Sequence, residues 1–286
     1  MPAELPLPIR APDPHEELFK QLFEQRCRHL LQSTIVPIFA ANNNSASKVG
    51  SIFVVNSEPI SEIATGSLFT DKGKRYLVTA AHVLRDFNAE DKHIRIAMGD
   101  PARPKPLPCF PENTEVNDEL DIGVVLLPPQ VSMQLVDAKY IRSDMVAQMD
   151  TLEEANYLLF GHIAERAFPN SDFTELHVPK FGFWTKPLRK EIAARSFNQS
   201  AHVLVEYGSD GMVVKDGDLV KTPVSLGGMS GSNLWRIFTL PELEPDQELP
   251  MPMVVAVENM VYDTTTVRCT LWKHVLPLIE SLANRS

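Results

Sequence analysis

The sequence has few cysteines, no long apolar run and too little positive charge to balance its acids. Its three cysteines lie far apart and form no CxxC pair, so we expect neither a disulfide framework nor a cysteine zinc site, and a reducing compartment is favoured. No apolar run is long enough to span a bilayer. The N-terminus has prolines and charges where a signal peptide needs apolar residues. These features predict a cytoplasmic protein that does not bind membranes.

The charge balance also limits the ligands that the protein can bind. Asp and Glu number 37 against 27 Lys and Arg, which gives a net charge of −10. A chain with this excess of acids attracts phosphate backbones poorly, so nucleic acid is not expected as a partner. The histidines form no HxxH or HxxxH pair, and we expect no metal ion or other cofactor. The length of 286 residues suggests one large domain or two small ones.

Residues 1–32 predict an N-terminal extension that contains one amphipathic helix. An N-cap aspartate, a proline and a glutamate form a helix start at residues 13–16, and apolar residues recur at helical spacing to about residue 32. Packing of the apolar stripe on the domain that follows is the favoured role. Docking of a regulatory protein partner is the alternative.

From Ser33 the sequence changes to short β-branched and aromatic runs separated by turn residues, which is typical of an all-β protein. The clearest hairpin is GSLFTDKGKRYLVT, with its turn at Asp71-Lys72-Gly73. A more helix-like stretch, residues 131–156, is expected to link two β units. The segment LWKHVLPLIESLAN predicts a short C-terminal helix, with Pro277 near its first turn or at a kink. Residues 240–252 predict an exposed acidic loop.

Three polar residues stand out by their position. His82 follows an apolar run and small residues in RYLVTAAH, Asp121 opens the apolar run DIGVVLL, and Ser230 lies between glycines in SLGGMSGSNLW. Each alone has an ordinary explanation as a structural histidine, a turn acid or a glycine-rich turn. A serine hydroxyl becomes a nucleophile only with a base in hydrogen-bond reach and donors for the oxyanion. Flanking glycines leave main-chain N–H groups free to point at one place.

Together, TAAH, DIGVVLL and GMSGS in this order resemble the motifs of the trypsin-like serine peptidases of the chymotrypsin fold. The resemblance covers about residues 33–286 and is closest to compact bacterial-type members, because cysteine pairs are absent. It implies two six-stranded antiparallel Greek-key β-barrels. Residues 33–140 would form the first barrel, and residues 141–286 the second, ending in the C-terminal helix.

The resemblance also implies a serine endopeptidase that cleaves a protein or peptide substrate. His82 would be the general base, Asp121 the acid that orients it, and Ser230 the nucleophile that forms the acyl-enzyme. The backbone N–H groups of Gly228 and Ser230 would form the oxyanion hole. Asp118 is the alternative acid, although only Asp121 directly precedes the apolar run.

Two positions depart from the family pattern. Met229 stands where secreted members have an aspartate that pairs with a newly cleaved N-terminus, so activity should not depend on removal of a propeptide. Val224 would lie at the base of the primary pocket, with Asn259, Met260 and Val261 along the substrate backbone. An uncharged pocket base disfavours lysine or arginine at the cleaved position and favours an apolar or small side chain.

Two other functions fit parts of the pattern. An esterase of the α/β-hydrolase kind would use Asp263 and His274 after the serine, but position 232 is Ser rather than Gly, and too few residues follow for the strand–helix units of that fold. The second alternative is a peptidase-like binding module that has lost turnover and presents its groove to protein partners. The retention of all three triad residues argues against such a module.

Overall fold

The computed structural model of the chain describes most residues from 34 onward. By number they are 34–42, 53–55, 58–88, 92–98, 100–133, 135, 138–164, 167–169, 176–178, 180–190, 192, 197–207, 212–215, 218–221, 225–237, 251–262 and 265–285. The predicted helix at 14–32, Val224 and all but the last two residues of the acidic loop lie outside these residues.

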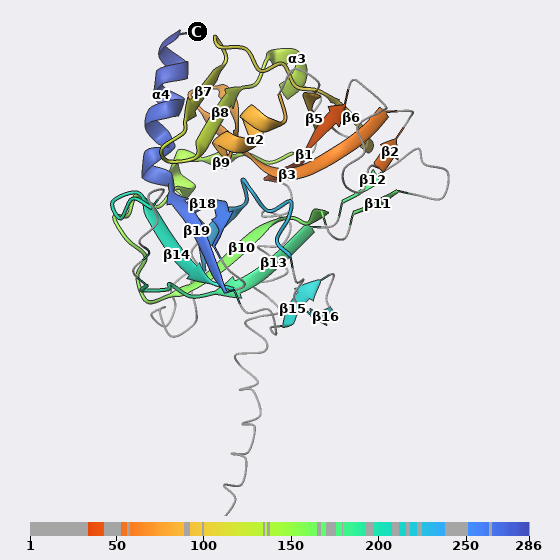
Figure 1. The fold of residues 1–286 in the computed structure, drawn as a ribbon. Helices are drawn as coiled ribbons and strands as arrows, with labels where there is room; N and C mark the ends of the chain where they lie inside the picture. Colours follow the sequence, from red (N-terminus) through yellow and green to blue (C-terminus); the bar gives the residue numbers. More distant parts are fainter. Residues whose placement is uncertain are drawn as a thin grey trace, which may run out of the picture.

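Two antiparallel sheets form most of the structure (Figure 1). The first contains β1 (Ile35–Asn42), β2 (Phe53–Val55), β3 (Glu58–Asp71), β4 (Lys74–Thr79), β5 (Lys92–Met98), β6 (Asp100–Pro106), β7 (Thr114–Asn117), β8 (Ile122–Leu126) and β9 (Ile141–Arg142). The second contains β10 (Asn156–His162), β13 (Lys180–Thr185), β14 (His202–Glu206), β17 (Asn233–Ile237), β18 (Met253–Val261) and β19 (Thr266–Leu271). Two small ribbons pair β11 (Phe168–Pro169) with β12 (Leu176–His177) and β15 (Met212–Lys215) with β16 (Asp218–Lys221).

The predicted all-β architecture with a C-terminal helix is confirmed. The strand order is β6-β5-β1-β3-β4-β8-β7 in the first sheet, with β2 and β9 paired to β3, and β13-β10-β17-β18-β19-β14 in the second. The first sheet therefore holds nine strands and the second six. Closure of each sheet into a six-stranded barrel, and the division at residue 140, stay predictions. Strand β9 lies just beyond that division and pairs with β3 of the first sheet.

The predicted hairpin joins β3 to β4. Asp71 pairs with Lys74, so the loop consists of Lys72 and Gly73, whose φ angles are 48° and 80°. Two consecutive residues with positive φ are the mark of a type I′ turn, whose twist matches that of the flanking strands. The hairpin fixes the register of β4, and β4 leads directly to His82.

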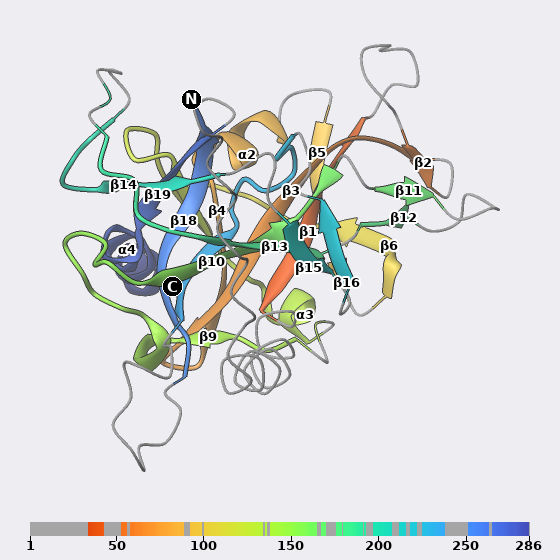
Figure 2. The same cartoon turned by 90° about the horizontal axis from the view of Figure 1, so that it is seen from below.

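The C-terminal helix α4 (Leu276–Arg285) begins at the residue before Pro277, where a proline costs no internal hydrogen bond. It crosses back to the first sheet beside β7 and β8 (Figure 1), and Figure 2 views it along its axis. Lys74 Nζ donates to the Ala283 carbonyl at 2.8 Å, and Arg285 contacts Glu115. The end of the chain therefore ties the two sheets together.

The stretch at residues 131–156 does connect the two sheets, but it is less helical than predicted. Its helices, in the part that the structure describes, are the end of α3 (Pro129–Ser132) and the single turn η1 (Ser143–Met145). The short strand β9 lies between them. Its pairing with β3 depends on a distant strand, which helical spacing within the stretch cannot reveal.

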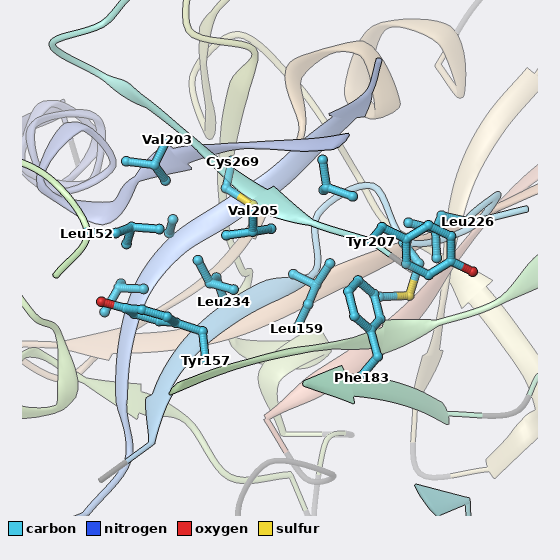
Figure 3. Close-up of a cluster of buried hydrophobic side chains, with 14 of the residues drawn as sticks. Leu152, Tyr157, Leu159, Phe183, Val203, Val205, Tyr207, Leu226, Leu234 and Cys269 are labelled. Atoms are coloured by element: carbon cyan, nitrogen blue, oxygen red, sulfur yellow. The ribbon is translucent and has the colours of Figure 1, made fainter. Parts of the chain in front are cut away.

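Three apolar clusters form the core. One lies within the second sheet (Figure 3) and another within the first. The third joins both sheets and α4. In it, Phe69 of β3 packs against Trp272 of the short helix η4 (Trp272–His274), with a centroid distance of 5.4 Å and the rings tilted by 42°. Burial of such large side chains, about 2–3 kcal/mol each, holds the sheets in one relative position. The groups that the two sheets bring together are therefore fixed.

In the part of the chain that the structure describes, no helix combines the length and apolar character needed to cross a bilayer. Cys109 and Cys269 are free thiols, and Cys27 lies outside the described residues.

Candidate active site

His82 lies in the first turn of helix α2 (Ala81–Asp86), immediately after β4. Ala80 and Ala81 are fully buried, and these small side chains let the backbone pass from strand to helix within one residue. A Cβ added to Gly123 of β8 would lie 2.4 Å from Leu84 Cδ1, so a larger residue at this position would displace the Leu84 side chain of α2. The packing brings His82 beside the start of β8, where Asp121 lies.

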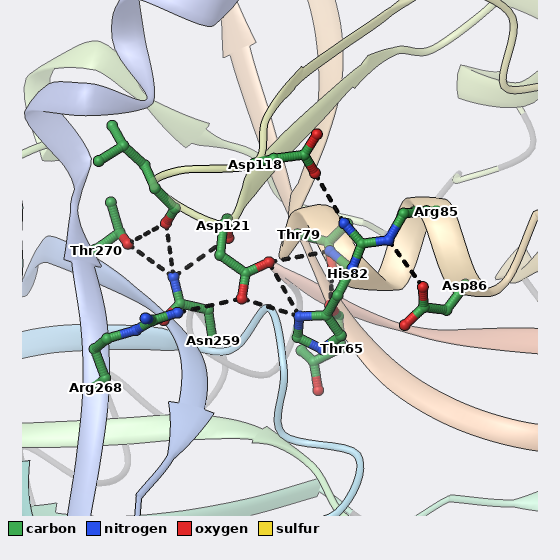
Figure 4. Close-up of polar contacts among 11 residues, drawn as sticks. Thr65, Thr79, His82, Arg85, Asp86, Asp118, Asp121, Asn259, Arg268 and Thr270 are labelled. Carbon is green, nitrogen blue, oxygen red and sulfur yellow. Dashed lines mark hydrogen bonds and ion pairs between the residues drawn. The ribbon is translucent and has the colours of Figure 1, made fainter. Parts of the chain in front are cut away.

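Asp121 binds His82 through three contacts (Figure 4). The ring Nδ1 lies 3.1 Å from each carboxylate oxygen, and the His82 backbone N–H donates to Oδ1 at 3.0 Å. Asp121 has a φ of 54°, a left-handed conformation that aspartate tolerates better than most residues. Burial alone would raise the pKa of Asp121, but the hydrogen bonds and charge of His82, with the charge of Arg268, hold this pKa below its usual value. The carboxylate is therefore ionised and oriented toward the imidazole.

The backbone that carries Asp121 is held by a polar group on β18 and β19. Asn259 Nδ2 donates to the carbonyls of Leu120 at 3.0 Å and of Asp121 at 3.3 Å. Thr270 Oγ1 donates to the same Leu120 carbonyl at 2.7 Å. Asn259 sits at a β-bulge, because the pairing of β18 with β19 shifts between Glu258 and Met260. A bulge re-aims one side chain of a strand, and here it turns Asn259 toward the Asp121 backbone.

Arg268 completes this polar group from β19. Its side chain is buried, donates from Nε to Asn259 Oδ1 at 2.8 Å and from Nη2 to Asp121 Oδ2 at 3.3 Å. Sequence reasoning missed Arg268 and Thr270. The alternation of polar and apolar residues in TVRCTL was the available signal, since it places Arg268 and Thr270 on one face of β19.

The Ser230 turn lies between the two sheets and is bonded to both. Thr65 of β3 donates from its backbone N–H to the Ser230 carbonyl at 2.9 Å and from Oγ1 to the Gly228 carbonyl at 2.8 Å. On the opposite side, the Gly231 N–H donates to the Glu258 carbonyl at 2.8 Å. Gly228 and Gly231 have φ angles of 95° and 92°, which only glycine adopts without strain.

The same threonine connects the Ser230 turn with the strand that leads to His82. Thr79, at the end of β4, donates from Oγ1 to the Thr65 carbonyl at 2.8 Å. On the other side, Glu258 directly precedes Asn259, which holds the Asp121 backbone. Two short chains of bonds therefore tie the Ser230 turn to the His82 and Asp121 sides.

Two features of the Ser230 turn bear on its chemistry. Among the described residues, no hydrogen bond joins His82 to Ser230, and the backbone N–H groups of Gly228 and Ser230 donate to no protein acceptor. The N–H of Met229, between them, donates to the Leu226 carbonyl at 2.9 Å. Within the described residues, the turn therefore has two backbone N–H groups, at Gly228 and Ser230, that no protein acceptor occupies.

The remaining predicted residues lie as follows. Asp118 is exposed and pairs with Arg85 at 2.9 Å, so of the two acids Asp121 is the one that contacts His82. The Asn259 side chain is buried in the polar group, whereas Met260 is half-buried and Val261 exposed. Their contact with a substrate backbone stays a prediction.

The alternative sites find less support. The sheets are almost entirely antiparallel, unlike the mostly parallel sheet of an α/β-hydrolase. His274 Nε2 lies 3.1 Å from the Ser200 carbonyl, and Asp263 lies outside the described residues. Within the described ranges, no group of three histidine, cysteine or acidic side chains is arranged to hold a metal ion.

Glu258 is an acid that sequence reasoning missed. Its side chain is buried, and its Oε2 has no hydrogen-bond partner among the described residues. The pKa of Glu258 is raised to about 8, chiefly by burial and also by the charge of Asp121, while the charge of Arg268 acts in the opposite direction. Glu258 is therefore mostly uncharged at neutral pH.

The raised pKa of Glu258 makes the stability of the fold depend on pH. Between its ordinary value of 4.5 and about 8, the unfolded chain releases this proton while the folded chain keeps it. Stability is therefore lost as pH rises through this window, by a few kcal/mol. We expect Glu258→Gln, which cannot ionise, to gain stability relative to the parent from pH 4.5 to 8. Urea unfolding across this range measures the gain.

The matched control is Glu280→Gln, at an exposed position of α4, which should follow the parent at every pH. His202, whose pKa burial lowers to about 4, titrates in the parent and in both variants, so its effect cancels in the comparison. A difference between Glu258→Gln and the parent that stays constant with pH would refute a buried, protonated Glu258.

Two solved structures similar to this chain are those of a protease and of an inactivated protease paralogue. The inactivated protease paralogue S-D1 of the scabies mite matches with a TM-score of 0.50 and 12% identity, over 90% of this chain and 95% of that chain. The inactive form of Rv3671c protease matches over 96% of this chain and 99% of that chain, with a TM-score of 0.44 and 12% identity. No family model and no curated protein matches the chain. The likeness to the mite paralogue confirms the predicted chymotrypsin fold, and at this identity it concerns the fold alone.

Proposed function

We propose that this chymotrypsin-fold chain is a serine endopeptidase in which His82, Asp121 and Ser230 form the catalytic triad. The observation that carries the proposal is the contact of the His82 ring with a part-buried, ionised carboxylate across 39 residues of sequence. Arg268 donates to this carboxylate, and Asn259 donates to the main-chain carbonyl of the same residue. A surface ion pair would have no need of such supports.

The geometry supports a definite role for the histidine. With its proton on Nδ1, donated to Asp121, the imidazole presents Nε2 as a base. The nearby carboxylate then stabilises the imidazolium that forms when Nε2 accepts a proton. Neither residue needs a metal ion for this step.

The proposed reaction follows the order of the serine-peptidase template. Ser230 Oγ bonds to the substrate carbonyl carbon while His82 takes its proton, and the N–H groups of Gly228 and Ser230 stabilise the oxyanion. The C–N bond then breaks, and the proton from His82 passes to the leaving amine. A water molecule then attacks the acyl-enzyme while His82 takes its proton, and the acyl group leaves Ser230 as the His82 proton returns to the serine oxygen. Each N–H donor contributes on the order of 3 kcal/mol to the transition state.

The proposed substrate is a peptide or protein segment bound in extended form. After the buried Asn259, strand β18 becomes half-buried at Met260 and exposed at Val261. We propose that the substrate pairs as an extended strand with the backbone of these two residues. We propose cleavage after an apolar or small side chain, because the family resemblance implies that Val224 would lie at the base of the primary pocket. Regulation by a protein partner at the N-terminal extension stays part of the proposal.

The second candidate is the peptidase-like binding module, which presents the same groove without turnover. The absence of a hydrogen bond between His82 and Ser230, both described residues, is the observation that favours it. Catalytic hydrogen bonds are often long in ligand-free enzymes and tighten with substrate, so the endopeptidase remains the better explanation. Proteins of this fold include an inactivated protease paralogue, which makes the distinction worth an experiment.

A serine-directed fluorophosphonate probe distinguishes the two functions. We expect the parent protein to be labelled, and Ser230→Ala and His82→Ala to be unlabelled, because the probe reacts only with an activated hydroxyl. Ser225→Ala, an exposed serine of the same turn, should keep its labelling. Folded parent protein that takes no label would contradict the endopeptidase and favour the binding module.

A further inference from the structure

A buried arginine lies against the carboxylate that orients His82. Arg268 is 1% exposed, and its Nη2 donates to Asp121 Oδ2 at 3.3 Å while its Nε donates to Asn259 Oδ1 at 2.8 Å (Figure 4). Asn259 Nδ2 in turn donates to Thr270 Oγ1 at 2.7 Å. The guanidinium is thus fixed in place by an amide that is itself fixed at the β18 bulge.

Asp121 is shared between two partners as a result. Its carboxylate accepts from His82 at 3.1 Å and from Arg268 at 3.3 Å. In the triad template the carboxylate stabilises the imidazolium. A second cation on the same carboxylate weakens the attraction between the carboxylate and the imidazolium. The effect of Arg268 is strong because its guanidinium is buried and water screens its charge little.

The other groups that face Asp121 do not cancel the charge of Arg268. The charged and titratable side chains around Asp121 are His82 and Arg85 of α2, His202 of β14, Glu258 of β18 and Arg268 of β19. Arg85 is 58% exposed and paired with Asp86 and Asp118. The pKa of His202 is lowered to about 4 and that of Glu258 raised to about 8, so both are mostly uncharged at neutral pH.

We propose that Arg268 is a positioning residue that holds the Asp121 carboxylate against His82 and withdraws part of its negative charge from the imidazole. The proposal rests on the proposed function, because it concerns how the triad is set. Its consequence is that the charge of Arg268 limits how strongly the Asp121 carboxylate stabilises the imidazolium form of His82.

The test is an NMR titration of the His82 ring in the Ser230→Ala protein, which needs no turnover. Arg268→Gln and Arg268→Met both remove the charge, and we expect each to move the midpoint of the titration about one pH unit higher. Arg268→Lys keeps the charge and should keep the midpoint near that of the parent. Arg85→Gln is the matched control, an exposed arginine whose loss should leave the midpoint unchanged.

Each outcome decides the proposal. A higher midpoint in Arg268→Gln or Arg268→Met, with Arg268→Lys unchanged, supports it. An unchanged midpoint in a folded uncharged variant overturns it, and so does the failure of both uncharged variants to fold, which would assign Arg268 to stability alone. The titration is independent of the probe experiment: unlabelled parent protein with a shifted midpoint rejects the endopeptidase alone.

Discussion

Replacing Asp121 by asparagine is expected to lower kcat on a peptide substrate by about four orders of magnitude. The amide carries no charge to stabilise the imidazolium, and its N–H₂ group can turn the His82 ring to the wrong tautomer. The local structure should persist, because Asn259 and Thr270 hold the backbone on both sides of the substitution through main-chain carbonyls. Steady-state kinetics with one peptide substrate measures the loss.

Asp118→Asn is the matched control for this prediction. Asp118 lies three residues earlier, is exposed and pairs only with a surface arginine among the described residues. Its replacement should leave kcat within about twofold, as is usual for surface ion pairs of small energetic value. Equal losses in both variants, or none in either, would show that the His82 contact with Asp121 is structural.

Gly231→Ala is expected to destabilise the fold by more than about 4 kcal/mol, at the high end of what single substitutions cause. A Cβ at this position would lie 2.0 Å from the Thr65 carbonyl oxygen and 2.4 Å from Thr79 Oγ1. These two atoms form the hydrogen bond that links the Ser230 turn to the end of β4. The φ of 92° adds backbone strain. Urea denaturation of the parent and variant measures the loss.

Gly73→Ala separates the strain from the collision. Gly73 has a similar φ of 80°, but a Cβ there meets nothing within 4 Å. We expect it to cost only the about 1–2 kcal/mol of the left-handed conformation. If the two alanine variants lose the same stability, the Ser230 turn is not clamped against Thr65 and Thr79 as the structure has it.

Several elements could be predicted because their signals are local. The turn residues Lys72 and Gly73 specify the β3–β4 hairpin through their positive φ angles. Pro277 and the apolar spacing after it specify helix α4. The structure of residues 131–156 was predicted less well, because its signal is not local. Strand β9 forms by pairing with β3, which is far away in the sequence. Backbone preference depends on residues that are adjacent in the sequence, whereas strand pairing depends on a strand that can be far away in the sequence.

The residues of the candidate active site fall into the same two groups, those with a local sequence signal and those without one. Local sequence pattern places His82, Asp121 and Ser230 at strand ends or among glycines, and it favours Asp121 over Asp118 because Asp121 directly precedes an apolar run. The positions of Arg268 and Glu258 near the Asp121 carboxylate follow from the fold, because β18 and β19 reach Asp121 through a bulge and an intersheet contact. Burial then leaves Glu258 protonated at neutral pH, while the Arg268 guanidinium donates to the Asp121 carboxylate. Neither burial nor proximity across 147 residues is encoded in local spacing.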